Sequence, residues 1–219
     1  MQLKVLDFQS FQPYSASQDK MRNFALHRSS DEIDECWLLE HSPVFTLGQA
    51  ADPGHILASS NIPVEKSDRG GQVTYHGPGL LMIYTLFDLN RHNLGVRDYV
   101  RALEAFIIDL LSNYQIEGHL KEGAPGVYVE GKKIASIGLR VRKGMSYHGT
   151  CLNVLGDLSP FSYINPCGYQ GLQMTKISDI ADVTIAEVKP VVIQYLLKHF
   201  QFTEHTQLTM CKTEEGMSL

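Results

Sequence analysis

The chain has 219 residues, of which 43% are hydrophobic and 20% charged, a composition that excludes collagen-like and disordered proteins. Nineteen Lys and Arg residues against 24 Asp and Glu give a formal net charge of −5, which argues against general binding to nucleic acid or to anionic membranes. The first 18 residues do not resemble a signal peptide, and the longest apolar run, residues 80–87, is too short to cross a bilayer.

The four cysteines and nine histidines follow no metal-ligand spacing, and the cysteines do not resemble a disulfide framework. We therefore expect reduced thiols, a cytoplasmic protein and no metal site. No repeat, low-complexity tract or linker interrupts the chain. This predicts one domain over residues 1–205 and a polar C-terminal tail, 206–219, that frays.

The first predicted helix follows Ser15 or Ser17 and turns Met21, Phe24 and Ala25 inward. The clearest helix covers residues 93–113, where apolar residues recur at steps of three and four. A last helix opens with the capping-box spacing Thr184-x-x-Glu187, and Pro190 is expected to kink it or to delay its start. The predicted strands are 37–40, 44–47, 80–87, 126–130, 133–141 and 147–154.

The helices are too few to alternate with the strands, and Gly131-Lys132 suits a two-residue hairpin that pairs Glu130 with Lys133 and Tyr128 with Ala135. The sequence therefore predicts an α+β fold with a mixed, largely antiparallel sheet packed with helices.

Residues 68–79 contain four glycines and run directly into the strand at 80–87. Glycines let backbone N–H groups approach a ligand closely, and Arg69 and His76 supply directed donors. The alternative is a pair of glycine-rich turns with a salt-bridged arginine.

Residues 131–149 carry five basic side chains and no acidic one. Such a segment suits docking of an anionic partner, or it merely keeps a sheet edge soluble. Within it, Lys133 either faces apolar cover, where desolvation makes an amine a better base, or is an exposed turn residue paired with Glu130. The residues alone favour the exposed alternative, because both faces of the hairpin are comparably apolar.

Residues 164–168, Ile-Asn-Pro-Cys-Gly, place Cys167 on a tight turn between Pro166 and Gly168. Rigid presentation of a thiol suits a nucleophile that accepts an acyl group. The alternative is a buried packing cysteine, which is the interpretation we keep for Cys36 and Cys151. On spacing alone, a pairing of a cysteine with His148 also stays open.

Four ordered segments, RGGQVTYHGPG (69–79), GVYVEGKKIASIGLRV (126–141), HGTCLNV (148–154) and INPCG (164–168), resemble the lipoyl(octanoyl) transferase family, and LLEHSPVFTLG (38–48) is also similar to it. The family shares its fold with lipoate-protein ligases and the catalytic domain of biotin-protein ligases. The similarity covers roughly residues 36–178, and it implies that the single domain predicted over residues 1–205 is a catalytic domain of this fold.

The resemblance implies that Cys167 accepts the acyl group and that Lys133 is its acid/base partner. It assigns substrate binding to Arg69, Gly70, Gly71, Gln72, Val73, Thr74, Tyr75, His76, Ser136, Ile137, Gly138, His148, Gly149 and Thr150. Gly77 and Leu152 match further positions, and Leu80 replaces a glutamine that the family usually has.

The activity implied is transfer of an octanoyl group from octanoyl-acyl carrier protein to a lysine of a lipoyl domain, through a Cys167 thioester and without ATP or another cofactor. Implied acceptors are the lipoyl domains of 2-oxoacid dehydrogenase complexes and the glycine cleavage H protein. The alternatives are an ATP-dependent lipoate-protein ligase, a thioesterase, and a non-catalytic binder of acyl carrier protein.

Overall fold

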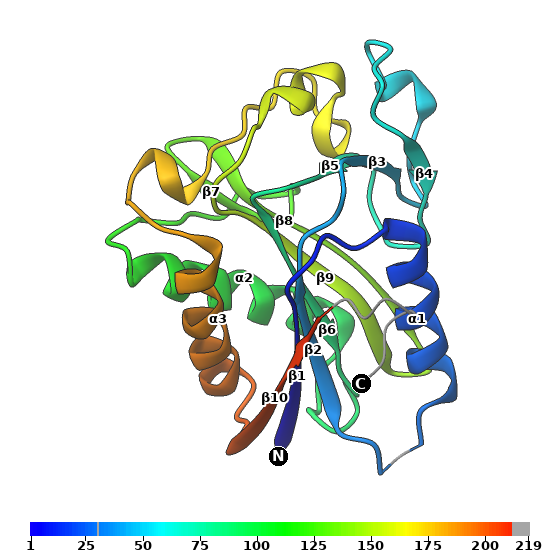
Figure 1. The fold of residues 1–219 in the computed structure, drawn as a ribbon, viewed down its shortest axis with the longest axis vertical. Coiled ribbons are helices and arrows are strands. Elements are labelled where there is room, and N and C mark those ends of the chain that lie inside the picture. The colour runs from blue at the N-terminus through cyan, green and yellow to red at the C-terminus, as the bar shows by residue number, and fades with distance from the viewer. Residues whose placement is uncertain (30, 212–219) are drawn as a thin grey trace.

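A seven-stranded mixed sheet forms the centre of the computed structural model, which describes residues 1–29 and 31–211 (Figure 1). Its strand order is β10-β1-β2-β6-β9-β8-β7. The strands are β1 (Gln2–Phe8), β2 (Asp34–Leu39), β6 (Leu80–Leu86), β7 (Val127–Val129), β8 (Lys132–Arg142), β9 (Met145–Asn153) and β10 (Glu204–Met210). Strand β1 runs parallel to β10 and β2, and the remaining pairs are antiparallel. The predicted α+β class is confirmed.

A second sheet has the order β4-β3-β5, formed by β3 (Val44–Leu47), β4 (Val64–Lys66) and β5 (Val73–His76). Helix α1 (Tyr14–His27) covers one face of the large sheet, whereas α2 (Val96–Ser112) and α3 (Ile185–His199) cover the other (Figure 1). The described residues include no helix that is both long and apolar enough to cross a membrane.

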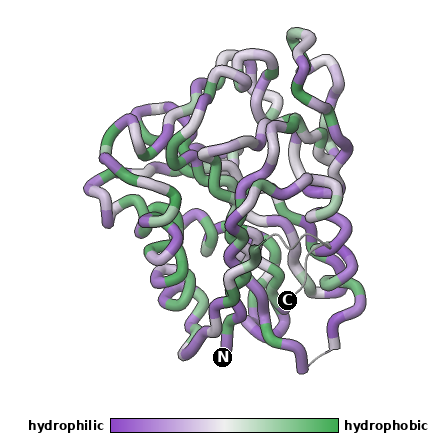
Figure 2. The backbone as a smooth tube through the Cα atoms, viewed as in Figure 1, coloured by the Kyte–Doolittle hydropathy of each residue, from purple (hydrophilic) through white to green (hydrophobic). Residues whose placement is uncertain are grey.

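The large sheet separates two apolar cores, because alternate side chains of a strand point to opposite faces. In β6, Leu80 and Met82 pack in the core on the α1 side, whereas Leu81 and Ile83 pack with α2 and α3. Hydrophobic residues accordingly gather along the central strands, and hydrophilic residues cover much of α1 (Figure 2).

The helices predicted at residues 93–113 and after Thr184 are both confirmed, with small shifts in their bounds. The helix expected at 93–113 is α2, and its buried residues lie at the three- and four-residue spacing. The Thr184 side chain accepts from the backbone N–H of Glu187 and the Glu187 side chain accepts from the backbone N–H of Thr184, which is the predicted capping box. Helix α3 begins directly after Thr184, so Pro190 does not delay its start.

The hairpin was predicted in the wrong register. Val129 pairs with Lys132 and Tyr128 with Lys133, so the loop consists of Glu130 and Gly131. Both loop residues have positive φ angles, 49° and 77°, as a two-residue turn of type I′ requires. The expected pairs Glu130 with Lys133 and Tyr128 with Ala135 are therefore wrong.

Four strands were not predicted: β1, β4, β5 and β10. Residues 206–210, expected in a frayed tail, belong to β10, which pairs along its whole length with β1. Residues 212–219 of that tail lie outside the described part of the chain.

Candidate active site

An amine and a thiol from distant parts of the chain meet at the end of β8. The Nζ of Lys133 donates to the Sγ of Cys167 over 3.2 Å. Lys133 is 1% exposed, and its Nζ also lies 5.4 Å from the centre of the Tyr128 ring. The expected exposed lysine paired with Glu130 is therefore wrong. His148 is not the partner of this thiol, because its Nε2 bonds the Asp68 carboxylate at 2.8 Å.

Backbone hydrogen bonds fix both flanks of the Cys167 turn. Downstream, the Lys133 N–H donates to Gln173 at 2.9 Å and the Lys133 carbonyl accepts from Thr175 at 3.0 Å, so the chain after Cys167 is paired with the start of β8. Upstream, the Asn165 N–H donates to the His55 carbonyl at 2.8 Å. The thiol is thus held by two separate attachments rather than presented on a free loop.

The turn itself holds Cys167 in an unusual conformation. Cys167 has φ 56° and ψ 17°, in the left-handed region that favours glycine, and Gly168 follows with φ 80°. Such a residue costs about 1–3 kcal/mol unless its surroundings impose it. The Gly168 N–H donates to the Asn165 carbonyl at 2.9 Å, closing the turn and leaving Cys167 half-buried.

Gly126 makes room for the buried lysine. A Cβ on Gly126 would lie 2.6 Å from Lys133 Cε and 2.4 Å from the carbonyl oxygen of Ala135. Gly126 also has φ 125°, which L side chains rarely adopt. The glycine at the start of the β7 segment is therefore required by the position of the Lys133 side chain.

The glycine-rich loop between β4 and β5 is organised by Arg69. This buried guanidinium donates to the carbonyl oxygens of Gly70, Thr46 and Gln72, at 2.9, 2.8 and 2.8 Å. Among the residues that the structure describes, no carboxylate lies in a salt bridge with it, so the alternative of a salt-bridged arginine is wrong. The Gly70 N–H donates to the Leu139 carbonyl at 3.0 Å, which attaches the loop to β8.

The dyad opens into a cavity of about 360 Å³ between this loop, β8 and α2. Its wall is mostly apolar, with polar groups from the loop and the dyad. The lining residues are Arg69, Gly70, Gly71, Gln72, Thr74, Val100, Pro125, Lys133, Ile137, Gly138, Leu139, Cys167 and Tyr169. We refer to this space as the outer pocket.

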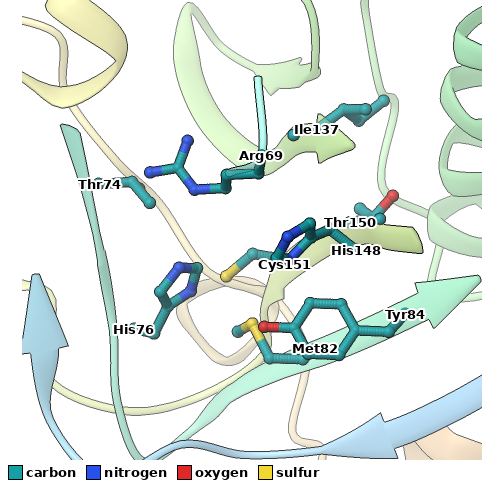
Figure 3. Close-up of a pocket in the computed structure, with 11 residues that line it drawn as sticks. Arg69, Thr74, His76, Met82, Tyr84, Ile137, His148, Thr150 and Cys151 are labelled. Carbon is teal, nitrogen blue, oxygen red and sulfur yellow. The ribbon is translucent and has the colours of Figure 1, made fainter. Parts of the chain in front are cut away.

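A smaller cavity of about 30 Å³ adjoins the outer pocket and shares Arg69, Thr74, Ile137 and Gly138 with it. Its remaining lining residues are His76, Met82, Tyr84, His148, Gly149, Thr150 and Cys151 (Figure 3). We refer to it as the inner pocket. Gly138 and Gly149 face each other across β8 and β9, and a Cβ on Gly149 would lie 2.3 Å from the Ile83 carbonyl oxygen.

The inner pocket borders a cluster of buried histidines. Burial lowers the pKa of His41 to about 4 and that of His76 well below its usual value. Burial also lowers the pKa of His148, against the opposing effect of Asp68. Burial tends to raise the pKa of Asp68, but hydrogen bonds from His148 and Tyr147 outweigh it and bring the pKa to about 2. These rings are therefore neutral near pH 7, and Asp68 is ionised.

Most expected site residues line one of the two pockets, but three do not. Val73 is fully buried, Tyr75 packs between Phe45 and Phe161, and Ser136 lines neither pocket. Leu80, where the resemblance led us to expect glutamine, lies fully buried in the core on the α1 side.

Sequence reasoning missed several residues of the site. The two most informative are Thr46, which bonds both Arg69 and His76, and Tyr84, whose hydroxyl bonds His41 at 2.7 Å. Thr46 lies within the segment 38–48 that carried the resemblance, whereas Tyr84 gave no signal because it falls in an ordinary apolar strand.

Within residues 1–29 and 31–211, no group of three or more His, Cys, Asp or Glu side chains could hold a metal ion. A thiol and a buried amine at the wall of a largely apolar pocket are typical of enzymes that handle acyl groups. The chain belongs to the lipoyl protein ligase A/B catalytic domain family, whose model matches residues 14–197.

Two relatives show how much of the chain is shared. It is 53% identical over 193 residues to a protein of Coxiella burnetii (strain Dugway 5J108-111) named octanoyltransferase, covering 88% of this chain and 80% of the relative. It is 51% identical over 199 residues to a protein of the same name from Pseudomonas putida (strain F1), covering 90% and 93%.

Solved structures with low sequence identity share the fold. A lipoate protein ligase of Thermoplasma acidophilum matches with a TM-score of 0.72 at 16% identity, covering 98% of this chain and 88% of that one. The biotin protein ligase of Aquifex aeolicus matches with a TM-score of 0.54 at 13% identity, covering 91% and 68%. The expected ligase-like fold is therefore confirmed.

Proposed function

We propose that this protein is an octanoyltransferase that moves an octanoyl group from octanoyl-acyl carrier protein to a lysine of a lipoyl domain, through a thioester on Cys167. The observation that carries the proposal is the 3.2 Å contact between Lys133 Nζ and Cys167 Sγ at the wall of the outer pocket. Relatives that share about half of its residues and are named octanoyltransferase support the same acyl group.

In the first half-reaction, the Lys133 amine takes the proton of the Cys167 thiol, and the thiolate attacks the carbonyl carbon of the octanoyl thioester. A new carbon–sulfur bond forms at Cys167 while the bond to the carrier sulfur breaks. The carrier leaves as a thiol after receiving the proton from Lys133. In this mechanism, backbone N–H groups near Cys167 and in the glycine-rich loop stabilise the oxyanion that develops on the carbonyl oxygen.

In the second half-reaction, the amine of the acceptor lysine attacks the Cys167 thioester. An amide bond forms, the Cys167 sulfur leaves, and the proton lost by the attacking amine passes through Lys133 to that sulfur. Conversion of a thioester to an amide is favourable, so the reaction needs no ATP and no other cofactor.

The acceptors we propose are the lipoyl domains of 2-oxoacid dehydrogenase complexes and the glycine cleavage H protein. Cys36, Cys151, Cys167 and Cys211 are all free thiols, which supports a reducing compartment and hence the cytoplasm.

The donor carrier is expected to approach along the basic edge of β8. Of the five basic residues in segment 131–149, Lys133 is buried and Arg140 half-buried, whereas Lys132, Arg142 and Lys143 are exposed to an anionic partner. Arg140 bonds Gln49 beside the glycine-rich loop, and the neighbouring Leu139 lines the outer pocket. Positive charge near the pocket steers an anionic donor toward Cys167.

The test is intact-mass analysis after mixing the protein with octanoyl-acyl carrier protein, followed by addition of a lipoyl domain without ATP. We expect an octanoyl adduct on Cys167 that then moves to the lipoyl domain. The Cys167→Ala variant loses the adduct, whereas the matched Cys211→Ala variant keeps it.

Other outcomes point to the alternatives. Transfer that requires ATP and persists in Cys167→Ala indicates a ligase, and release of the acyl group to water alone indicates a thioesterase. Binding of the carrier without any adduct indicates a non-catalytic binder.

A further inference from the structure

The inner pocket carries polar atoms with unused hydrogen-bonding capacity, and the first is on His76. Thr46 Oγ1 faces two donors of Arg69, Nε at 3.3 Å and Nη2 at 2.8 Å, the second of which it shares with two carbonyl oxygens, so its own proton points away from the guanidinium. Its one proton therefore goes to His76 Nε2, 3.1 Å away. Because Nε2 of this neutral ring is an acceptor, Nδ1 carries the proton. That N–H donor is buried and has no partner among the described residues.

His148 presents the opposite group. Its Nε2 lies 2.8 Å from the ionised carboxylate of Asp68, which can only accept, so Nε2 carries the proton. The neutral ring then leaves Nδ1 as a bare acceptor. His148 is 1% exposed, and within the part of the chain that the structure describes its Nδ1 has no hydrogen-bond partner.

Tyr84 adds a second acceptor. The Nδ1 of His41 lies 2.8 Å from the Gln12 carbonyl, which accepts only, so Nδ1 carries the proton and Nε2 accepts. The Tyr84 hydroxyl, 2.7 Å from that Nε2, must donate to it. Lone pairs of the Tyr84 oxygen therefore remain free to accept another hydrogen bond.

His76, His148 and Tyr84 all line the inner pocket, and Figure 3 shows them around one space. The cavity of about 30 Å³ exceeds the roughly 10–15 Å³ that one water needs. One donor and two acceptors match the three hydrogen bonds that a buried water typically makes. The Thr150 hydroxyl also lines the inner pocket, is buried and has no hydrogen-bond partner among the described residues, so it is a fourth polar group there.

We propose that the inner pocket binds one ordered water, which accepts from His76 Nδ1 and donates to His148 Nδ1 and to the Tyr84 oxygen, and that this water sets the chain length of the acyl group. The inference rests on the proposed function, because it assumes that the acyl chain runs from Cys167 through the outer pocket toward this end.

An eight-carbon chain ends against the water, whereas a longer chain has to displace it. Methylene groups cannot replace its hydrogen bonds, so displacement leaves the His76 donor and the His148 acceptor buried and unsatisfied, which is strongly unfavourable. We therefore expect the protein to transfer decanoyl at least about tenfold more slowly than octanoyl. The length of the acyl chain is then limited by the loss of buried hydrogen bonds as well as by steric exclusion.

The test uses one reaction containing equal amounts of octanoyl- and decanoyl-acyl carrier protein, with the ratio of Cys167 adducts read by intact mass. The ratio is internal, so it stays readable in a variant of low activity. We expect His76→Phe and Tyr84→Phe, which remove hydrogen-bonding atoms but keep a ring, to raise the decanoyl share at least about fivefold. The control Tyr99→Phe removes a buried hydroxyl that bonds Thr85 and does not line the inner pocket, so it leaves the ratio as in the parent protein.

A crystal structure of the octanoyl-enzyme gives the second readout. It should show the water within hydrogen-bond distance of His76, His148 and Tyr84, and the decanoyl-enzyme should lack it. An octanoyl-enzyme whose inner pocket is dry or filled by the acyl methyl overturns the proposal, as does an unchanged adduct ratio in Tyr84→Phe.

Failure of the proposed function is distinguishable, because then no adduct forms with either chain. In that case crystals of the unmodified protein decide whether the water site exists, and its absence there overturns this inference separately.

Discussion

Lys133 Nζ lies 3.2 Å from Cys167 Sγ although the two residues are 34 positions apart in the sequence. The contact exists because the chain that leaves Cys167 returns to pair with the Lys133 backbone, through the bonds of Lys133 with Gln173 and Thr175. The same strand end thus supplies the amine and anchors the turn that carries the thiol.

Replacing Lys133 by Ala should lower the rate of octanoyl transfer by about 10²–10⁴-fold, the usual contribution of a positioned acid or base. The measurement is the rate of adduct formation on Cys167, together with thermal unfolding to show that the fold is retained. Lys132→Ala is the matched control, since Lys132 is the exposed neighbour in the same strand. Equal rates for the two variants contradict the assigned role of Lys133.

Gly126→Ala should both destabilise the protein and displace the lysine. The new methyl group would lie 2.6 Å from Lys133 Cε, and the backbone φ of 125° is strained for alanine. We expect the temperature midpoint of unfolding to fall and acyl transfer to fall more than tenfold. Gly131→Ala is a suitable control, because it has positive φ but nothing within 4 Å of its Cβ position. If both variants lose activity equally, contact with Lys133 is not the cause.

Arg69→Lys should lower the free energy of unfolding by about 2–4 kcal/mol. A lysine lacks the planar fork that reaches several carbonyl oxygens at once, so buried backbone acceptors lose their donor. Urea unfolding measures the effect, and Arg97→Lys, at an exposed position of α2, should change it by less than about 0.5 kcal/mol. If Arg69→Lys lowers the free energy of unfolding as little as Arg97→Lys does, the contacts of Arg69 with the carbonyl oxygens do not stabilise the loop.

Stability should fall as the pH is lowered from 6.5 to 4. Burial lowers the pKa of His41 to about 4 in the folded protein. Between that value and the usual pKa near 6.5, the unfolded chain binds more protons than the folded one, so the free energy of unfolding rises with pH. His41 alone contributes about 3 kcal/mol across this window.

A series of urea unfolding curves from pH 4 to 8 checks this expectation. His41→Gln should flatten the dependence even if it lowers stability overall, whereas His205→Gln, at an exposed position of β10, should leave the slope unchanged. An unaltered slope in His41→Gln excludes His41 as its source.

Thiol labelling of the native protein should separate the four cysteines. Burial raises the pKa of Cys36 and Cys151, and both side chains are shielded, so neither should react with iodoacetamide. In a Cys211→Ser background, labelling should occur on Cys167 alone, and prior acylation should block it. Peptide mapping by mass spectrometry identifies the labelled residue, and early modification of Cys151 goes against this interpretation.

The sequence by itself determined the class of the fold and most of its elements, because periodicity, capping and glycine placement are local. The α2 pattern and the Thr184 capping box needed no tertiary information. The resemblance of four ordered segments to a known family also pointed to Cys167 and Lys133 as the reactive pair. The edge strands β4 and β10 were missed because they expose most of their residues and lack the apolar alternation that marks a strand.

Only the tertiary structure decided which way Lys133 faces. Both faces of the hairpin are apolar, so burial could not choose between them, and a one-residue change of register reverses the direction of every side chain. The φ angles of Glu130 and Gly131 fixed that register, and the return of the chain after Cys167 covered the lysine. The inner pocket depended on the fold for the same reason, since its polar atoms come from strands that meet only after two sheets have packed together.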